Sequence, residues 1–192
     1  MSLVKKGNPG YARSRKIKLG IFSLVGFLIM AAIYITGYLI FRTGKNYVTI
    51  LAVLTVLPTA KIFVTYLMIP WSLKADKNTL EELSKQTAPL KPYCELLITA
   101  KEKRFAITYL IIGRDDGIIA FTGDSKAKTE DFETGVVNFL NYYDLNANVK
   151  LFTDYRQFEK RAKQLAARNS ELTNEEAEHI EFVFEKISIM SI

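Results

Sequence analysis

The sequence predicts a membrane-anchored α+β protein with an N-terminal two-helix transmembrane hairpin and a small cytosolic domain. Two long apolar runs come first, and strand-like and helix-like segments follow after residue 74. The domain is expected to contain an antiparallel three-stranded meander, an added short strand and covering helices. The expected divisions are a basic cytosolic tail over residues 1–18, the hairpin over residues 19–73 and the α+β domain over residues 74–192.

The two apolar runs are long enough to cross a bilayer. Residues 19–41 carry no charge, and residues 47–69 carry only Lys61. At a rise of about 1.5 Å per residue, either run spans a hydrocarbon core of about 30 Å. Residues 42–46 then form the outer loop. Small side chains predict that the two helices pack closely against each other; they include Gly20, Ser23, Gly26, Thr55, Thr59 and Ala60.

Charge is divided unevenly along the chain. Residues 1–73 hold nine Lys and Arg and no acid, whereas the remaining residues hold 17 basic and 20 acidic side chains, a net charge of −3. The basicity belongs to the hairpin end, so we expect no specific nucleic-acid binding. The positive-inside rule places both chain ends in the cytoplasm of a multi-pass protein of the cell (inner) membrane. A single cysteine agrees with that location.

Several charged or aromatic side chains flank or enter the spans. Arg13, Arg15, Lys16 and Lys18 either contact anionic lipid headgroups or only set the topology. Trp71 is expected to be an interfacial anchor. Lys61 lies about 12 Å from the inner end of its span on helical rise. Its ammonium either pairs with a carboxylate of another membrane subunit or extends towards the inner phosphates.

The domain is expected to begin with a helix capped by Asn78 and ending near residue 86. Three strands follow over residues 93–99, 104–112 and 117–122, with turns at 101–103 and 113–117. A helix from about residue 130 covers the sheet, and a short strand spans residues 149–152. Asp154 and Thr173 are predicted to cap two further helices, ending near residues 168 and 186. Residues 187–192 form either an edge strand or a docking tail, which makes a homo-oligomer one expected assembly.

The chemistry-bearing residue types are few. His179, the one histidine, sits among glutamates on a predicted helix and is expected to be solvated. Cys94, the one cysteine, begins an apolar strand and is expected to be a buried small hydrophobe. Metal sites need several such side chains converging, so no metal and no cofactor are expected. Glycine-rich phosphate loops and serine-nucleophile motifs are absent from the sequence.

One enzymatic hypothesis remains open. The order helix, three strands, helix, strand is also that of the restriction-endonuclease-like nucleases, which carry Asp-x-Lys or Glu-x-Lys on the third strand. Here Asp124 and Lys126 fall just beyond the third predicted strand, with Asp115 or Asp116 as second metal ligands. That pattern would give a membrane-anchored, metal-dependent hydrolase.

The sequence favours a non-enzymatic role. We expect a membrane-tethered cytosolic interaction or assembly module, acting as a subunit or scaffold at the inner membrane face. Its expected partners are the lipid bilayer, anionic lipid headgroups, and another membrane subunit or a second copy of the chain. The alternatives are the hydrolase and an accessory subunit of a transporter or secretion complex, the latter motivated by Lys61.

Overall fold

The computed structural model describes residues 5–42, 47–71, 73–114 and 116–191. The chain is a mixed α+β protein with two long apolar N-terminal helices and a four-stranded sheet. It divides into two compact units, residues 13–71 and residues 1–12 together with 72–192. We call them the helical hairpin and the domain, and describe each by itself.

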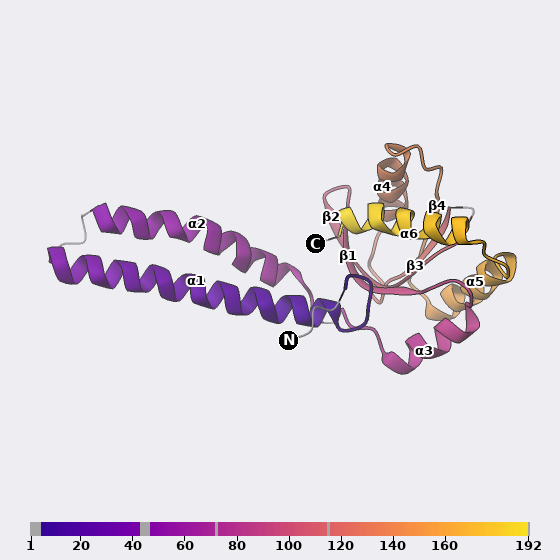
Figure 1. Ribbon diagram of the computed structural model, residues 1–192, viewed down its shortest axis with the longest axis horizontal. Coiled ribbons are helices and arrows are strands. Elements are labelled where there is room, and N and C mark those ends of the chain that lie inside the picture. The colour runs from indigo at the N-terminus through magenta and orange to yellow at the C-terminus, as the bar shows by residue number, and fades with distance from the viewer. Residues whose placement is uncertain (1–4, 43–46, 72, 115, 192) are drawn as a thin grey trace. The chain divides into compact units, whose positions relative to one another are not determined.

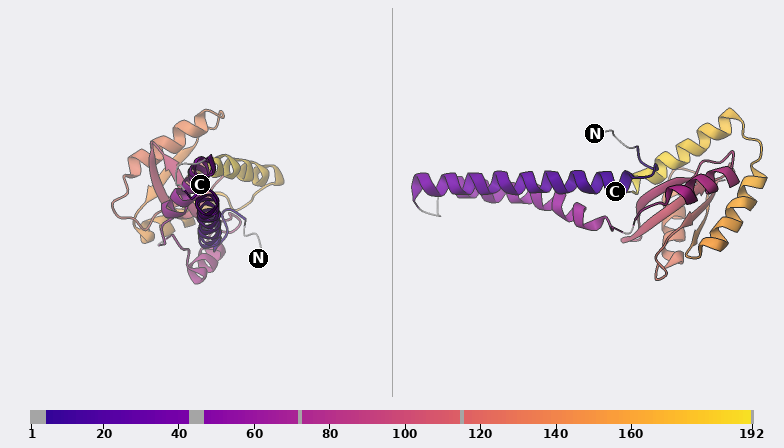
Figure 2. Two further views of the ribbon diagram at one scale, coloured as in Figure 1. Left: turned by 90° about the vertical axis from the view of Figure 1, so that its left-hand side faces the viewer. Right: turned by 90° about the horizontal axis from the view of Figure 1, so that it is seen from below.

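The helical hairpin consists of α1 (Tyr11–Phe41) and α2 (Tyr47–Met68), which run side by side (Figures 1 and 2). Both helices are long and apolar enough to cross a membrane. Helix α1 begins at Tyr11 rather than at residue 19, so residues 11–18 of the expected basic tail are helical, while the cytosolic location of that segment stays a prediction. The segment from residue 11 contains no glycine or proline before Gly20, and nothing in it opposes a helix.

Close packing between the two helices, predicted from their small side chains, is confirmed. A Cβ atom added to Gly26 of α1 would lie 2.7 Å from the Oγ1 atom of Thr59 of α2, so the helices approach too closely for a larger residue there. The next residue of α1, Phe27, meets Phe63 of α2 edge to face with 5.7 Å between ring centroids. The small residue therefore sets the distance between the helices.

The sheet of the domain contains β1 (Tyr93–Ala100), β2 (Lys103–Ile112), β3 (Gly117–Phe121) and β4 (Asn148–Phe152), in that spatial order. The first three strands pair antiparallel and β4 pairs parallel to β3. The predicted meander and the added strand are thus both present. Lys101 and Glu102 take φ angles of 46° and 62°, the left-handed pair that a two-residue hairpin turn requires.

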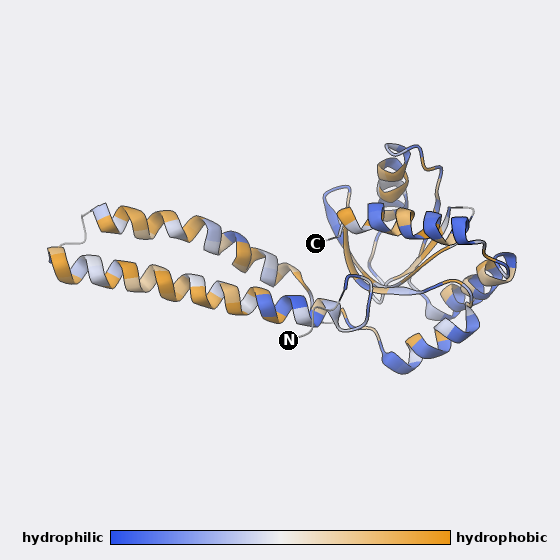
Figure 3. Ribbon diagram, viewed as in Figure 1, coloured by the Kyte–Doolittle hydropathy of each residue, from blue (hydrophilic) through white to orange (hydrophobic). Residues whose placement is uncertain are grey.

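Four helices accompany the sheet: α3 (Lys77–Gln86), α4 (Thr129–Asn141), α5 (Tyr155–Arg168) and α6 (Asn174–Ile189). Consecutive residues Ile118, Ile119 and Ala120 of β3 are all buried. Since successive side chains of a strand point to opposite faces, both faces of the sheet are covered. Figure 3 shows the consequence, with apolar strands inside and polar helix surfaces outside.

The predicted helix caps are confirmed at two of three positions. Asp154 accepts a hydrogen bond from the N–H of Arg156, and Thr173 and Glu176 form a capping box. The cap at Asn78 is wrong. Asp76 fills that role, accepting from the N–H of Thr79 at 3.0 Å, because the helix begins two residues earlier than expected.

The C-terminal tail was expected to be a strand or a docking peptide, and this is corrected in part. Residues 187–189 continue α6, because Ile187 extends the buried stripe of Ile180 and Val183. Only the end of the tail reaches the sheet, where Ser191 forms an isolated bridge with Ile98 and the carbonyl of Met190 accepts from the N–H of Thr99. Ile192 lies outside the described residues.

The N-terminal residues belong to the domain and do not form the free tail that the sequence suggested. Gly7 bridges to the outer edge of β1, where its carbonyl accepts from the N–H of Cys94 at 2.9 Å. The ammonium of Lys6 donates to the carbonyls of Ser188 and Ser191 at 2.7 and 2.6 Å. Lysine is favourable there, because the C-terminal end of a helix carries partial negative charge.

Candidate functional site: a basic pocket beside the edge strand

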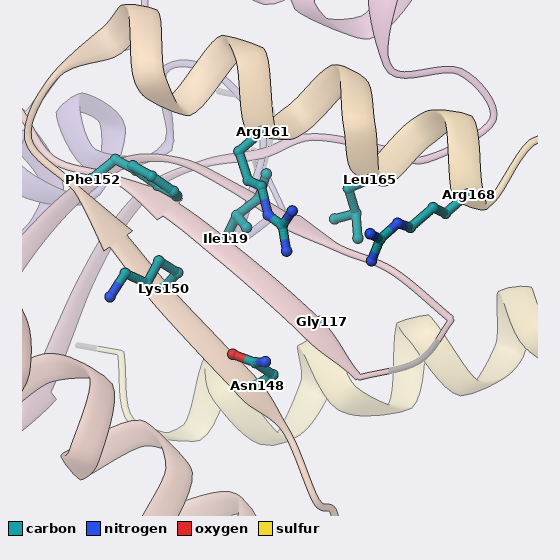
Figure 4. Close-up of a pocket in the computed structure, with 8 residues that line it drawn as sticks. All are labelled: Gly117, Ile119, Asn148, Lys150, Phe152, Arg161, Leu165 and Arg168. Carbon is teal, nitrogen blue, oxygen red and sulfur yellow. The ribbon is translucent and has the colours of Figure 1, made fainter.

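A pocket of about 390 Å³ opens between α5 and the strands β3 and β4. Helix α5 packs mainly on β3, with Phe158 against Phe121 at 5.7 Å between ring centroids, and it leaves part of the edge strand β4 uncovered. Figure 4 shows the side chains around this gap. The lining residues are Gly117, Ile119, Asn148, Lys150, Phe152, Arg161, Leu165 and Arg168.

Two regular periods place these residues together. Arg161 and Arg168 are seven positions apart on α5, about two helical turns, so they share a flank with Leu165 between them. Asn148, Lys150 and Phe152 alternate along β4 and therefore point to the same face of the sheet. Figure 4 shows the two guanidinium groups extending from α5 over the strands, whereas the ammonium of Lys150 points away from them.

The lining carries three cations and no carboxylate. Lys150 is partly compensated from outside the pocket, since a carboxylate oxygen of Glu133 lies 3.4 Å from its ammonium. Arg161 donates to the neutral amide oxygen of Gln164 at 3.1 Å. Within the described parts of the chain, no ion pair engages either guanidinium group. The floor of the pocket is apolar, formed by Ile119, Phe152 and Leu165.

This pocket was not predicted from the sequence. The basic residues of α5 look like an ordinary solvated helix face in the sequence, and Lys150 looks like the polar side of a short strand. The usable signal was the combination of a seven-residue spacing on α5 with alternation on β4, but that signal has meaning only once the two elements are known to be adjacent.

A second site missed by sequence analysis is the carboxylate of Glu95, which is 3% exposed in the middle of β1. One of its oxygens accepts from the N–H groups of Gly10 and Ala75, and the other accepts from the N–H of Ala12, at 3.0, 3.1 and 3.0 Å. Gly10 and Ala12 flank the first residue of α1. An anion is favourable at this helix terminus, where the first N–H groups have no partner within the helix.

The backbone of Glu95 is also unusual, with a φ of 57° in the left-handed region. A residue other than glycine in that region costs about 1 kcal/mol or more. Its three hydrogen bonds compensate this cost, because each involves a charged acceptor and a backbone donor. A single acid inside the apolar stretch Tyr93–Thr99 was the signal in the sequence, since buried acids need partners.

The residues of the hydrolase hypothesis do not come together. Asp124 accepts from the N–H of Lys126 at 3.0 Å, which is a local turn after β3. Asp116 lies before the first residue of β3, at the opposite end of that strand, and its carboxylate is 2.8 Å from Nε2 of His179. Asp115 lies outside the described residues. Among the residues described, no three His, Cys, Asp or Glu side chains gather as metal ligands would.

Cys94 is buried in the core, whereas the side chain of His179 is partly exposed. Cys94 is buried as expected, and burial, helped by the charge of Glu95, raises the pKa of its thiol to about 12. The thiolate form needed for nucleophilic chemistry is therefore suppressed. His179 was expected to be solvated among glutamates. Instead, Nε2 of its ring lies 2.8 Å from a carboxylate oxygen of Asp116.

Of the basic residues predicted to face lipid headgroups, Lys16 behaves differently. Its side chain is 4% exposed inside the hairpin, donates to the carbonyl of Ile69 and lies 4.0 Å from the ring centroid of Trp71. A headgroup contact of Lys16 stays a prediction, and in the structure its ammonium is engaged by a backbone carbonyl at the end of α2. Trp71 itself is exposed, as an interfacial residue would be. Arg13 and Lys61 are exposed on the hairpin surface.

No family model matches the chain, and no curated protein or solved structure matches it either. Functional arguments therefore depend on the geometry of the chain alone.

Proposed function

We propose that this chain is a membrane-tethered module, in which α1 and α2 anchor the domain to a bilayer and the domain binds a partner. The observation that carries this proposal is the placement of exposed apolar surface. Within the described residues, the large apolar side chains left exposed lie between residues 17 and 71, apart from Tyr142, Phe182 and Ile189. In the most apolar 18-residue segments of α1 and α2, only 6% and 11% of the segment is buried inside the structure.

Such a surface is unfavourable in water, at about 25 cal/mol per Å² of apolar area. A core helix of a soluble protein would instead bury its apolar stripe. Lipid is the solvent that accommodates a helix pair that is apolar on its outside.

The charge distribution supports a cytoplasmic domain. Arg13, Arg15, Lys16 and Lys18 lie in the first turns of α1, and Lys74 and Lys77 follow α2, against Arg42 and Lys45 near the connection between the helices. The positive-inside rule then puts the domain and both described chain ends on the cytoplasmic side.

A binding role for the domain is supported by the few large apolar groups it exposes. Tyr142 is 84% exposed at the end of α4, while Phe182 and Ile189 are 43% and 59% exposed on α6. The ammonium of Lys186 lies 4.6 Å from the ring centroid of Phe182 and 5.0 Å from that of Tyr143. Aromatic side chains are enriched where proteins bind each other.

The test uses single cysteines and a membrane-impermeant maleimide. Native Cys94 is buried and unreactive, so it provides a silent background. Thr43→Cys, between the two spans, should be labelled in intact cells, and Ser170→Cys, in the exposed loop after α5, only after lysis. Both proteins should remain in the pellet after alkaline carbonate extraction. Release by carbonate would refute the anchor, and labelling of Ser170→Cys in intact cells would refute the orientation.

Lys61 provides a second candidate role, as an accessory subunit of a larger membrane complex. Its side chain is exposed on the surface of α2, and no carboxylate occurs in residues 1–73 to neutralise it. An intramembrane charge needs a partner, which another subunit would supply. Mild-detergent purification of Lys61→Leu should then lose co-purifying membrane chains that the wild type and Ala32→Leu retain. Equal recovery with all three proteins would exclude this role for Lys61.

A further inference from the structure

The basic pocket beside β4 has the composition of an anion site with an apolar floor. We infer that it binds a phosphate monoester, with the phosphate held by Arg161 and Arg168 and the organic part lying over Ile119, Phe152 and Leu165. This inference concerns the domain alone and does not depend on the membrane-anchoring proposal.

The charge of the pocket is the first argument. Three cations line one volume with no carboxylate among the lining residues, and only Lys150 has an acidic neighbour, Glu133. Like charges gathered at one site repel each other, and an anion bound among them relieves that repulsion. Some exposed cations elsewhere in the domain pair with acids, as in Lys103 with Asp131 and Lys163 with Glu159.

The type of cation is the second argument. A guanidinium group is planar and donates two parallel hydrogen bonds to a phosphate or carboxylate. The donors of Arg161 are used only once in the described part of the chain, towards a neutral amide. In Figure 4 the guanidinium groups of Arg161 and Arg168 extend from α5 on either side of Leu165, so that two planar donor groups border the same volume.

Size and floor are the third argument. A volume of about 390 Å³ exceeds what a bare inorganic ion needs and lies within the range of small-molecule pockets. The apolar floor gives no favourable contact to an ion alone. An organic group attached to the phosphate would cover Ile119, Phe152 and Leu165 and remove that apolar surface from water.

The test is isothermal titration of the full chain in a neutral detergent with phenyl phosphate, inorganic phosphate and a short-chain phosphatidic acid. We expect phenyl phosphate to bind more tightly than inorganic phosphate. The double variant Arg161→Ala/Arg168→Ala should weaken binding by a factor on the order of 30. Arg156→Ala is the matched control, because Arg156 is an exposed arginine of the same helix that does not line the pocket. It should change the affinity less than about twofold.

The outcomes identify the source of the ligand and test the site and its apolar floor separately. Binding of phenyl phosphate assigns the ligand to soluble phosphate esters, and binding of phosphatidic acid alone assigns the same chemistry to a lipid headgroup. Equal losses in the double variant and in Arg156→Ala would overturn the site, as would the absence of binding by all three probes at millimolar concentration. Equal affinity for phenyl phosphate and inorganic phosphate would overturn the role of the apolar floor. Unchanged thermal unfolding of both variants establishes that they are folded.

Discussion

The helical hairpin exposes most of its large apolar side chains and the domain buries most of its own, yet each unit contains one buried charged side chain at a helix end. In the hairpin the buried charge is the ammonium of Lys16, which donates to the carbonyl of Ile69 just beyond the last residue of α2. In the domain it is the carboxylate of Glu95, which accepts from N–H groups at the start of α1. A cation at a C-terminal end and an anion at an N-terminal end are the two favourable combinations.

In both units, the buried charged side chain forms its hydrogen bonds with backbone groups. Neither Lys16 nor Glu95 forms an ion pair among the described residues. Each satisfies peptide groups that the end of a helix leaves without a partner, which is cheaper than burying an unpartnered charge. Glu95 accepts three hydrogen bonds and Lys16 donates one. Substitution of Glu95 should therefore lower the free energy of unfolding more than substitution of Lys16.

Substitution of Glu95 should have the largest effect. Glu95→Ala leaves three N–H groups without their acceptor and should lower the free energy of unfolding by about 4 kcal/mol, since each buried unsatisfied donor costs about 1–3 kcal/mol. Glu95→Gln keeps one acceptor oxygen and should lose about half as much. Thermal unfolding of the full chain in detergent provides the measurement.

A glycine variant separates the two features of Glu95. Glu95→Gly relieves the left-handed backbone but also removes the carboxylate, so it should be about 1 kcal/mol less destabilising than Glu95→Ala. If both variants matched the wild type, the three hydrogen bonds would contribute nothing and the comparison with Lys16 would fail.

Lys16→Met should cost about 2 kcal/mol, because it removes one charge-assisted hydrogen bond and the cation–π contact with Trp71 while keeping the apolar stem. Arg13→Met is the control, since Arg13 is exposed on the same helix. Protease resistance of the segment after α2 should fall in the first variant only. Similar behaviour of the two variants would mean that burial of Lys16 has no energetic role.

Gly26→Val tests the packing of the hairpin without any charge. The added side chain meets Thr59, so the helices must separate, at a cost of about 1–2 kcal/mol. Ala32→Val adds two carbon atoms, against three in Gly26→Val, at an exposed position of α1 and should be neutral. Disulfide crosslinking between cysteines placed on the two helices would report the separation, and equal crosslinking in both variants would contradict it.

Thr173→Ala should have the smallest effect, about 1 kcal/mol, because it removes one half of the capping box of α6. Thr153→Ala changes an exposed threonine before α5 and is expected to be silent. Chemical denaturation of the full chain compares the two. A silent Thr173→Ala would show that α6 is held by packing alone.

Most local structure followed from local signals. The turn at Lys101 and Glu102, the cap at Asp154 and the capping box at Thr173 each depend on residues a few positions apart, and each was predictable. Glu95 and the pocket were not, because their partners are distant in the chain. Glu95 binds Gly10, which is 85 residues away, and the pocket needs α5 to lie beside β4. Spacing within one element does not encode which other element it meets.

The edges of the sheet have a consequence for the proposed membrane anchoring. The outer edge of β1 is engaged at both ends, by Gly7 and by Met190 with Ser191, and at the other edge the carboxylate of Glu133 accepts from the N–H of Leu151 in β4. Proteins confined to two dimensions collide often, and open strand edges would then recruit one another into intermolecular sheets. With the outer edge of β1 engaged at both ends and one N–H of β4 satisfied by Glu133, the chain offers few free edge groups for such pairing under the proposed membrane anchoring.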